Sequence, residues 1–297
     1  MEAFGKEAGQ LKRPCLAEGT KFTVELLFKR TASEAAVKSV LDAVRLFGLL
    51  GGVGARSRRG WGSVQLLSLT EDGRPLSDVP TTAEAYARAL KKLLPAGTTA
   101  ARYSAFVGGT EGTHLRMVRP TKRLLDAIER KAADNGLSML EALGAAMVWY
   151  RGWGHGGRIA TGERMHWPSA KNFPSDHDWF RYGDQPQDFH PERIVFGLPH
   201  MYSKTDGVEP AEYSRRASPL LLHVVRLDGQ YCGVATILHS DFLPPDENKV
   251  TLLHKGHTTT VVADPDFELL LNYLDFAPDG QGRLLEQVGP PILAGGL

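Results

Sequence analysis

Residues 51–62 combine five glycines with three arginines in twelve positions. Glycine lets the backbone adopt positive φ angles and approach a ligand closely, so this segment predicts a tight loop. Guanidinium groups form paired hydrogen bonds with phosphate oxygens, successive backbone N–H groups can form an anion-binding concavity, and Trp61 offers a ring on which a base can stack. An RNA strand is the ligand that uses all of these groups. The alternative is a tight turn with solvated arginines and a tryptophan in the core.

The residues around this glycine loop carry positive charges and no negative ones. No acidic residue lies between Asp42 and Glu71, whereas Arg45 and the three loop arginines all lie there. Two common phosphate-binding motifs do not fit the loop. Ser57 stands where a Rossmann fingerprint has its third glycine, and no Gly-Lys-Ser/Thr follows as in a Walker A loop. A site that hydrolyses mononucleotides is therefore not expected.

Regular elements are predicted on both sides of the loop. Apolar residues alternate along 22–28, which predicts a half-buried strand. Thr31 to Glu34 form a capping box that opens a helix ending near Leu50, and a second strand is predicted over 63–69. Strand, helix, glycine loop and strand make up half of a ferredoxin-like fold or a simple βαβ unit.

The rest of the chain predicts further helices and strands in an α+β mixture. Helical periodicity and capping signals indicate helices over 82–94, 120–136, 138–149 and 267–274. Strands are predicted over 193–198, 219–227 and 230–238, and the last two flank Asp228-Gly229, a strong hairpin signal. Residues 151–191 show no period, and long irregular segments of this kind are often functional.

Composition limits the classes of partner. The chain has 35 basic and 34 acidic residues, a net charge of +1, so any polyanion site must be local. This balance argues against a uniformly basic coat protein and against a free-standing single-strand RNA-binding protein. Two cysteines are too few for a disulfide framework and favour a reducing cytosol. The charged N-terminus lacks the apolar core of a signal peptide, and no apolar run is long enough for a transmembrane helix. A cytoplasmic protein without a membrane partner is therefore expected.

Basic residues outside the loop are weaker candidates for RNA contacts. Histidines and tryptophans gather in 151–191 beside four basic residues, which fits RNA stacking and phosphate contacts. These basic residues are Arg151, Arg158, Arg164 and Lys171. The alternative for that stretch is a surface loop packed by its own aromatic residues. Arg215 and Arg216 precede a predicted strand and indicate a positively charged strand edge or an RNA contact.

Two further patterns suggest chemistry but lack essential parts. The triplet Asp176-His177-Asp178 has the composition of an acid–base site, which would also need a nearby nucleophile. His254 and His257 could ligate a metal, but no third or fourth ligand follows at a useful spacing. No metal, no cofactor and no catalytic residue is therefore expected.

Four stretches of the chain together carry a family resemblance. Leu49-Leu-Gly-Gly-Val-Gly-Ala-Arg-Ser-Arg-Arg-Gly-Trp-Gly-Ser63 looks like the glycine-rich loop of the RAMP superfamily of CRISPR-associated proteins. Taken in order with 18–26, 193–200 and 215–220, it resembles the first-numbered RAMP subunit of the type III-B (Cmr) effector complex. The resemblance covers roughly residues 18–243.

The resemblance implies an α+β fold of two RRM-like, or ferredoxin-like, modules. Residues 1–80 would hold the C-terminal half of a first module with its glycine loop, and 81–297 a second module with a long irregular insertion at about 151–191. Members normally begin with a strand, a helix and a strand that are not recognisable here, so the first module is expected to be incomplete. A separate chain, or the residues before Glu18, is then expected to fill the gap between 22–28 and 63–69 with a strand, because unpaired strand edges invite association.

The resemblance also implies a function. Such a subunit binds CRISPR RNA and target RNA in antiviral defence, together with other Cmr-type subunits that carry out cleavage, and is itself non-catalytic. The alternative is a RAMP-type endoribonuclease that processes CRISPR RNA with a histidine as general acid or base; in those enzymes the loop tends to lie near the C-terminus. The expected RNA-binding residues are Gly52, Gly54, Arg56, Ser57, Arg58, Arg59, Gly60, Trp61, Gly62, Arg45, Arg158, Lys171, Arg215 and Arg216.

Overall fold

The computed structural model describes residues 16–76, 79–94, 113–152, 172–182, 191–238 and 241–294. The chain divides into two compact units, Met1–Leu41 and Asp42–Leu297. Helices and antiparallel sheets are both present, so the predicted α+β class is confirmed. None of the helices in these residues is long and apolar enough to cross a membrane.

The described part of the first unit leads into α1 (Glu34–Leu50), which continues into the second unit. The predicted helix is confirmed, but it begins later than the capping-box pattern indicates. The hydroxyl of Ser33, instead of that of Thr31, accepts the backbone N–H of Ala36 at 3.3 Å. This caps one of the unpaired N–H groups at the start of the helix.

The strand predicted over 22–28 is wrong. These residues have no regular structure, and the side chains of Phe22 and Val24 are exposed. The described residues of this unit contain no strand that could pair with the segment. An extended segment without a partner gains neither ladder hydrogen bonds nor a packed face, so alternation alone does not make a strand.

The second unit is built on a four-stranded antiparallel sheet with the order β10-β3-β7-β6. Its strands are β3 (Thr113–Pro120), β6 (Leu220–Leu227), β7 (Gln230–Ile237) and β10 (Leu285–Ala294). The predicted hairpin between β6 and β7 is confirmed. Asp228 and Gly229 both have positive φ, 51° and 75°, which suits the two-residue turns that match strand twist.

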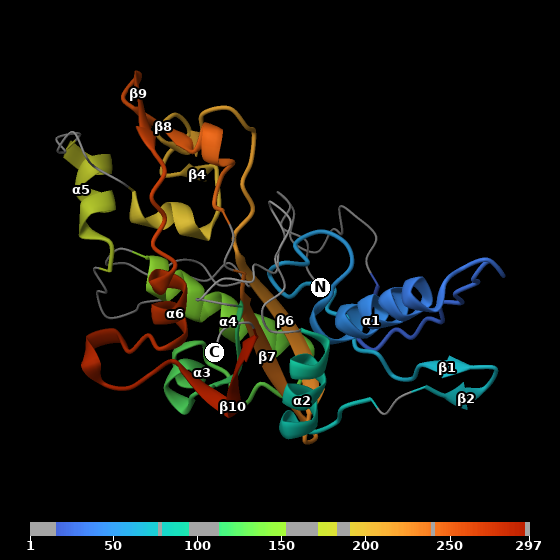
Figure 1. Cartoon of the computed structure of the whole chain (residues 1–297). Coiled ribbons are helices and arrows are strands. Elements are labelled where there is room, and N and C mark those ends of the chain that lie inside the picture. Colours follow the sequence, from blue (N-terminus) through green and yellow to red (C-terminus); the bar gives the residue numbers. More distant parts are fainter. Residues whose placement is uncertain are drawn as a thin grey trace. The chain divides into compact units, whose positions relative to one another are not determined.

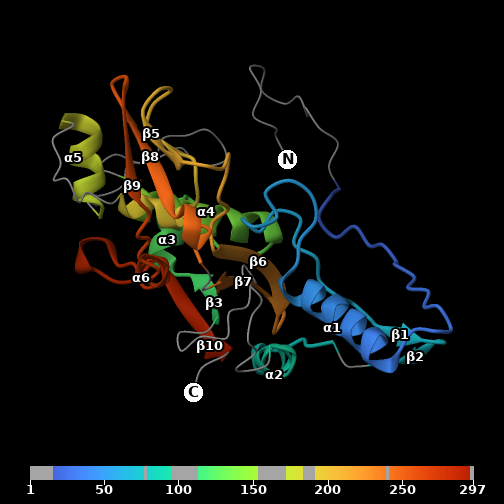
Figure 2. The same ribbon diagram turned by 45° about the horizontal axis from the view of Figure 1, so that its top comes forward.

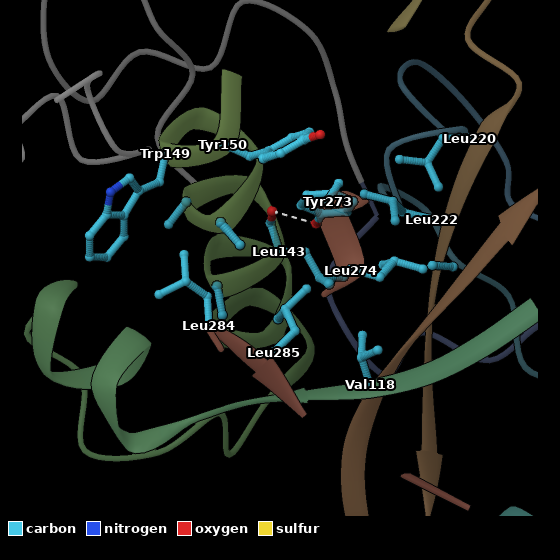
Figure 3. Packing of buried hydrophobic residues seen from close by; sticks show 14 of the residues in the cluster. Val118, Leu143, Trp149, Tyr150, Leu220, Leu222, Tyr273, Leu274, Leu284 and Leu285 are labelled. Carbon is cyan, nitrogen blue, oxygen red and sulfur yellow. Dashed lines mark hydrogen bonds between the residues drawn. The ribbon is translucent and has the colours of Figure 1, made fainter. Parts of the chain in front are cut away.

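One face of this sheet is covered by α4 (Gly136–Arg151) and α6 (Glu268–Leu274). Figure 3 shows this core, where the hydroxyl of Tyr273 donates to the carbonyl of Leu143 at 3.1 Å. The helix predicted over 267–274 is confirmed. The one predicted over 138–149 begins two residues earlier, because Asn135 caps it and accepts the N–H of Ser138 at 2.8 Å.

The other face carries α2 (Ala83–Leu93), which packs against β10 (Figure 1). The helix predicted over 82–94 is confirmed, with Thr82 as its N-cap. The helix predicted over 120–136 is shorter than expected. Only α3 (Lys122–Ala127) forms, and Glu129 just beyond it takes a positive φ of 56° that ends helical geometry.

A second four-stranded sheet, in the order β4-β5-β8-β9, lies within the same unit (Figure 2). Its strands are β4 (His200–Met201), β5 (Gly207–Pro210), β8 (Lys249–His254) and β9 (His257–Val262). The smaller elements of the unit are α5 (Pro174–Tyr182), η1 (Glu192–Phe196), η2 (Pro245–Glu247), η3 (Pro278–Gly280) and the hairpin of β1 (Thr70–Glu71) with β2 (Arg74–Pro75). Along the chain, the strands of the main sheet and the two helices on its first face follow the order β3, α4, β6, β7, α6, β10.

Two predictions for residues 151–198 need correction. The strand predicted over 193–198 is the 3₁₀ helix η1, because the buried carboxylate of Asp176 accepts the N–H groups of Glu192 and Arg193 at 2.7 and 3.1 Å and so caps a helical turn. The irregular stretch 151–191 contains the helix α5. The parts at 153–171 and 183–190 lie outside the described residues.

Candidate nucleic-acid interface

The glycine loop closes on itself at its base. Gly52 and Ser63 form an antiparallel bridge, and the N–H of Val53 donates to the carbonyl of Gly62 at 2.9 Å. Gly62 has a φ of 68°, and a Cβ placed there would lie 2.0 Å from the carbonyl oxygen of Val53. Only glycine fits this position, so the base of the loop depends on one residue type.

The loop is fixed to the edge of the main sheet. β6 is an edge strand, and the N–H of Leu222 donates to the carbonyl of Arg58 at 2.8 Å. Two residues further along β6, the N–H of Val224 donates to the hydroxyl of Ser63 at 2.9 Å. Unpaired edge groups promote aggregation when they are left open. The loop therefore covers the edge of β6 and in turn gains a rigid support.

The predicted strand over 63–69 is wrong, and the same edge explains why. After Ser63, the amide side chain of Gln65 accepts the N–H of Arg226 at 3.3 Å and donates to its carbonyl at 3.4 Å. Side chains, instead of a backbone ladder, thus satisfy the polar groups of β6, and regular pairing resumes only in β1 and β2.

A buried histidine fixes the start of the loop. The ring Nδ1 of His223, on β6, lies 3.0 Å from the carbonyl oxygen of Gly51, so Nδ1 carries the proton and donates. Burial lowers the pKa of His223 to about 4, although the hydrogen bond to Gly51 opposes this shift. The histidine is therefore neutral at pH 7 and acts as a support for the loop.

The three loop arginines all have exposed side chains. Arg56 occupies a positive φ of 64°, and its carbonyl accepts the N–H of Arg59 at 2.8 Å, which makes a tight turn. The guanidinium of Arg58 donates to the carbonyl of Ser218 at 3.1 Å. Trp61 is half-buried. The loop thus presents three cations to solvent from a backbone that is tied down on both sides.

Arg216, one of the predicted contacts, has a structural position beside the loop. It is half-buried, and its guanidinium donates to the carbonyl of Phe242 and, at 2.8 Å, to that of Ala217. Its pKa is lowered by burial and by the positive charge of Arg58. Arg216 therefore supports the segment around Phe242 and adds positive charge next to Arg58, while Arg215 is exposed.

Arg151, the last residue of α4, brings a further positive charge to the loop. Its Nη2 lies 3.0 Å from Nδ1 of His200, and its guanidinium lies over the ring of Phe196 at 4.8 Å. The pKa of Arg151 is lowered to about 10 by burial and by the positive charges of Arg59 and Arg193. The loop arginine Arg59 is therefore an electrostatic neighbour of Arg151.

The remaining predicted RNA-binding residues are scattered. Arg45 pairs with Asp42 on α1 at 2.9 Å, so its charge is partly neutralised. Arg158 and Lys171 lie outside the described residues.

Within the triplet that suggested acid–base chemistry, Nδ1 of His177 lies 3.0 Å from a carboxylate oxygen of Asp178. Asp176 is fully buried and holds η1 in place, with no exposed face for a substrate. His254 packs against Trp179 with ring centroids 5.5 Å apart. Within the described residues, no group of three or more His, Cys, Asp or Glu side chains could hold a metal ion.

Sequence reasoning missed the residues that attach the loop to the sheet. Ser63, Gln65 and His223 are ordinary residues in local context, and their partners lie about 160 positions away in the chain. The basic residue at the end of α4 was one of several arginines in an irregular stretch. The sequence suggested a phosphate contact for Arg151 among these basic residues, but no local pattern placed it near the loop.

A family model, that of the RAMP superfamily, matches residues 3–65. The matched segment contains α1 and the complete glycine loop. It starts upstream of residue 18, where the resemblance was expected to begin, and it ends just beyond the loop. No curated protein and no solved structure matches the chain.

Proposed function

We propose that this chain is an RNA-binding protein of the CRISPR-associated RAMP type and that the glycine loop is its main RNA contact. One observation carries the proposal: the segment similar to the RAMP superfamily contains a rigid loop that presents Arg56, Arg58 and Arg59 to solvent. Three exposed guanidinium groups on a fixed backbone suit the spaced phosphates of a nucleic acid strand.

The architecture of the second unit supports a RAMP module. Its main sheet has the order β10-β3-β7-β6, and its elements follow a β-α-β-β-α-β sequence with both helices, α4 and α6, on one face. This strand order and connectivity support a ferredoxin-like, or RRM-like, module. We infer one such module here, with the glycine loop attached to its edge strand.

Within this class, we propose a non-catalytic subunit of a type III-B (Cmr) effector that contacts CRISPR RNA and target RNA beside other subunits. The four stretches of sequence similar to that subunit support this assignment. Asp176, one of the two acidic residues of the candidate acid–base triplet, accepts hydrogen bonds that hold η1, which argues against a role for it as a general base. Contacts of the loop to phosphates position an RNA without reading its sequence.

The salt dependence of RNA binding tests the proposed contact. Each lost phosphate contact lowers the slope of log K against log salt by about 0.7 for single strands, so Arg56, Arg58 and Arg59 changed together to Ala should lower it by about 2. The matched control changes three exposed basic residues of α2, Arg88, Lys91 and Lys92, to Ala. An unchanged slope in the loop variant would refute the assignment.

A nuclease assay tests the non-catalytic assignment. The purified chain is incubated with labelled CRISPR RNA and target RNA, with and without Mg²⁺, and both RNAs are expected to stay intact. Specific cleavage that disappears in a His177→Ala variant would instead identify a RAMP-type endoribonuclease.

A further inference from the structure

The glycine loop does not carry its positive charge alone. Arg58 lies close enough to Arg216 to lower the pKa of that side chain, and Arg59 does the same to Arg151. Each of these two loop arginines is therefore an electrostatic neighbour of a second arginine from elsewhere in the fold. Like charges in a partly buried place repel each other more strongly than in water. Such pairs are stabilised when an anion lies between them.

Of the two partner arginines, Arg151 has the more deeply buried side chain. Its Nε is buried and has no hydrogen-bond partner among the described residues, while its Nη2 contacts a neutral ring nitrogen of His200. Its guanidinium also lies over the face of Phe196. A buried guanidinium usually pairs with a carboxylate or phosphate, because leaving the charge uncompensated is costly.

The nearby carboxylate, Asp176, already accepts hydrogen bonds from other groups. It accepts the N–H groups of Glu192 and Arg193, the Nε–H of Arg193 at 3.1 Å and the hydroxyl of Tyr202 at 2.7 Å. Oδ2 accepts three of these hydrogen bonds and Oδ1 accepts one. Asp176 therefore pairs directly with Arg193, and its charge offsets only part of the effect of burial and of Arg59 and Arg193 on Arg151.

His200 adds a neutral donor to the same place. Because the guanidinium of Arg151 can only donate, Nδ1 of His200 must accept, and its proton then lies on Nε2. The pKa of His200 is lowered to about 3 by burial and by the charges of Arg151 and Arg193, so the ring stays neutral at pH 7. A neutral imidazole N–H can donate to a phosphate oxygen without adding charge.

We propose that Arg151, His200 and the loop arginine Arg59 form a second anion site that holds one phosphate of the bound RNA. This inference rests on the proposed RNA-binding function and extends it from the loop to the end of α4. Arg59 approaches the phosphate from the loop, Arg151 from the helix and His200 from β4. The RNA backbone would then run from the exposed arginines of the loop toward the second sheet.

The test measures binding of a fluorescent uridine homopolymer as a function of salt. Arg151→Gln should lower the slope of log K against log salt by about 0.7, the value for one phosphate. His200→Ala should weaken binding several-fold with the slope unchanged, because the neutral ring replaces no counterion. Because both arginines are needed to hold the one phosphate, Arg59→Ala combined with Arg151→Gln should lower the slope by about 0.7 again instead of about 1.4.

Thermal unfolding of the same variants distinguishes a ligand-binding role of Arg151 from a role in stabilising the folded protein. Removing an uncompensated cation should leave the Tm of the RNA-free protein unchanged or raise it. If Arg151 instead stabilised the folded protein, its replacement would lower the Tm. A lower Tm for Arg151→Gln with a parental slope overturns the proposal. Arg151→Lys is the conservative variant: it keeps the charge without the planar fork, so the slope should persist while the affinity falls.

The loop variants decide which proposal has failed. If the triple loop variant loses salt dependence while Arg151→Gln keeps the parental slope, the second site is refuted and the RNA-binding loop stands. If neither variant changes the slope, the RNA-binding function itself is refuted.

Discussion

The backbone N–H of Leu222 donates to the carbonyl of Arg58 at 2.8 Å, although the two residues lie far apart in the chain. Leu222 belongs to the edge strand β6, and Arg58 belongs to the glycine loop. One hydrogen bond thus serves two purposes: it satisfies an edge N–H of the sheet, and it fixes the backbone from which the Arg58 side chain extends. Mutations that loosen the loop should therefore affect both stability and RNA binding.

Gly62→Ala should destabilise the protein by about 1–3 kcal/mol or more, the cost of a strained backbone position. A Cβ at Gly62 would collide with the carbonyl of Val53, and the φ of 68° disfavours any side chain. Gly54→Ala is the matched control, since Gly54 also has a positive φ, 83°, but has open space around it. Chemical denaturation compares the two. Equal losses would show that the close contact with Val53 contributes nothing.

Ser63→Ala should cost about 1–3 kcal/mol, because it leaves the N–H of Val224 without its hydrogen-bond partner. The same change should weaken RNA binding, since Ser63 closes the base of the loop against Gly52. Ser68→Ala, at an exposed position a few residues away, is the control. Thermal melts and RNA titrations of both variants check this prediction, and a Ser63→Ala protein with parental stability would contradict it.

The elements that could be predicted from the sequence are those with local causes. The Asp228-Gly229 hairpin formed because two residues that tolerate positive φ sit between β-rich runs. The helix ends shifted by a few residues because Ser33 and Asn135 made better caps than the predicted ones. In both helices, the deciding interaction lies within three residues of the helix start.

The elements that could not be predicted depend on distant partners. The apolar run at 193–198 became a 3₁₀ helix because Asp176, on another helix, accepts its first N–H groups. The composition of the glycine loop indicated an anion-binding segment, but nothing local indicated that it attaches to β6. The bond from Arg58 to Ser218 spans 160 residues of sequence, and its existence depends on the complete sheet.

Residues 22–28 should become protected when a partner chain supplies a strand. Phe22 and Val24 are exposed, and the backbone there has no ladder, so its amide hydrogens should exchange rapidly in the isolated chain. Pairing with a strand from a separate chain, such as a neighbouring subunit of a type III-B effector, should slow exchange at alternate amides. Hydrogen exchange of the isolated chain and of the co-purified complex compares the two states. Strong protection in the isolated chain would contradict the idea that the segment lacks a partner.

Stability should fall on acidification because of His223. Its pKa is about 4 in the folded protein, held down by burial, against about 6.5 in the unfolded chain. The unfolded state therefore binds more protons between these values. The contribution of the neutral histidine is complete above pH 6.5, and it is lost as the pH falls toward 4. A shift of this size corresponds to a loss on the order of 3 kcal/mol.

A variant that cannot titrate isolates this effect. In His223→Asn, the side-chain amide can still donate to the carbonyl of Gly51, as Nδ1 does now, without taking up a proton. The variant should be less stable than the parent at pH 7, because it leaves a small cavity, yet its stability should change less between pH 6.5 and 4. His257→Asn, at an exposed position, should keep the parental pH dependence. Equal acid sensitivity of parent and His223→Asn in denaturant titrations would show that protonation of His223 does not release the loop from β6.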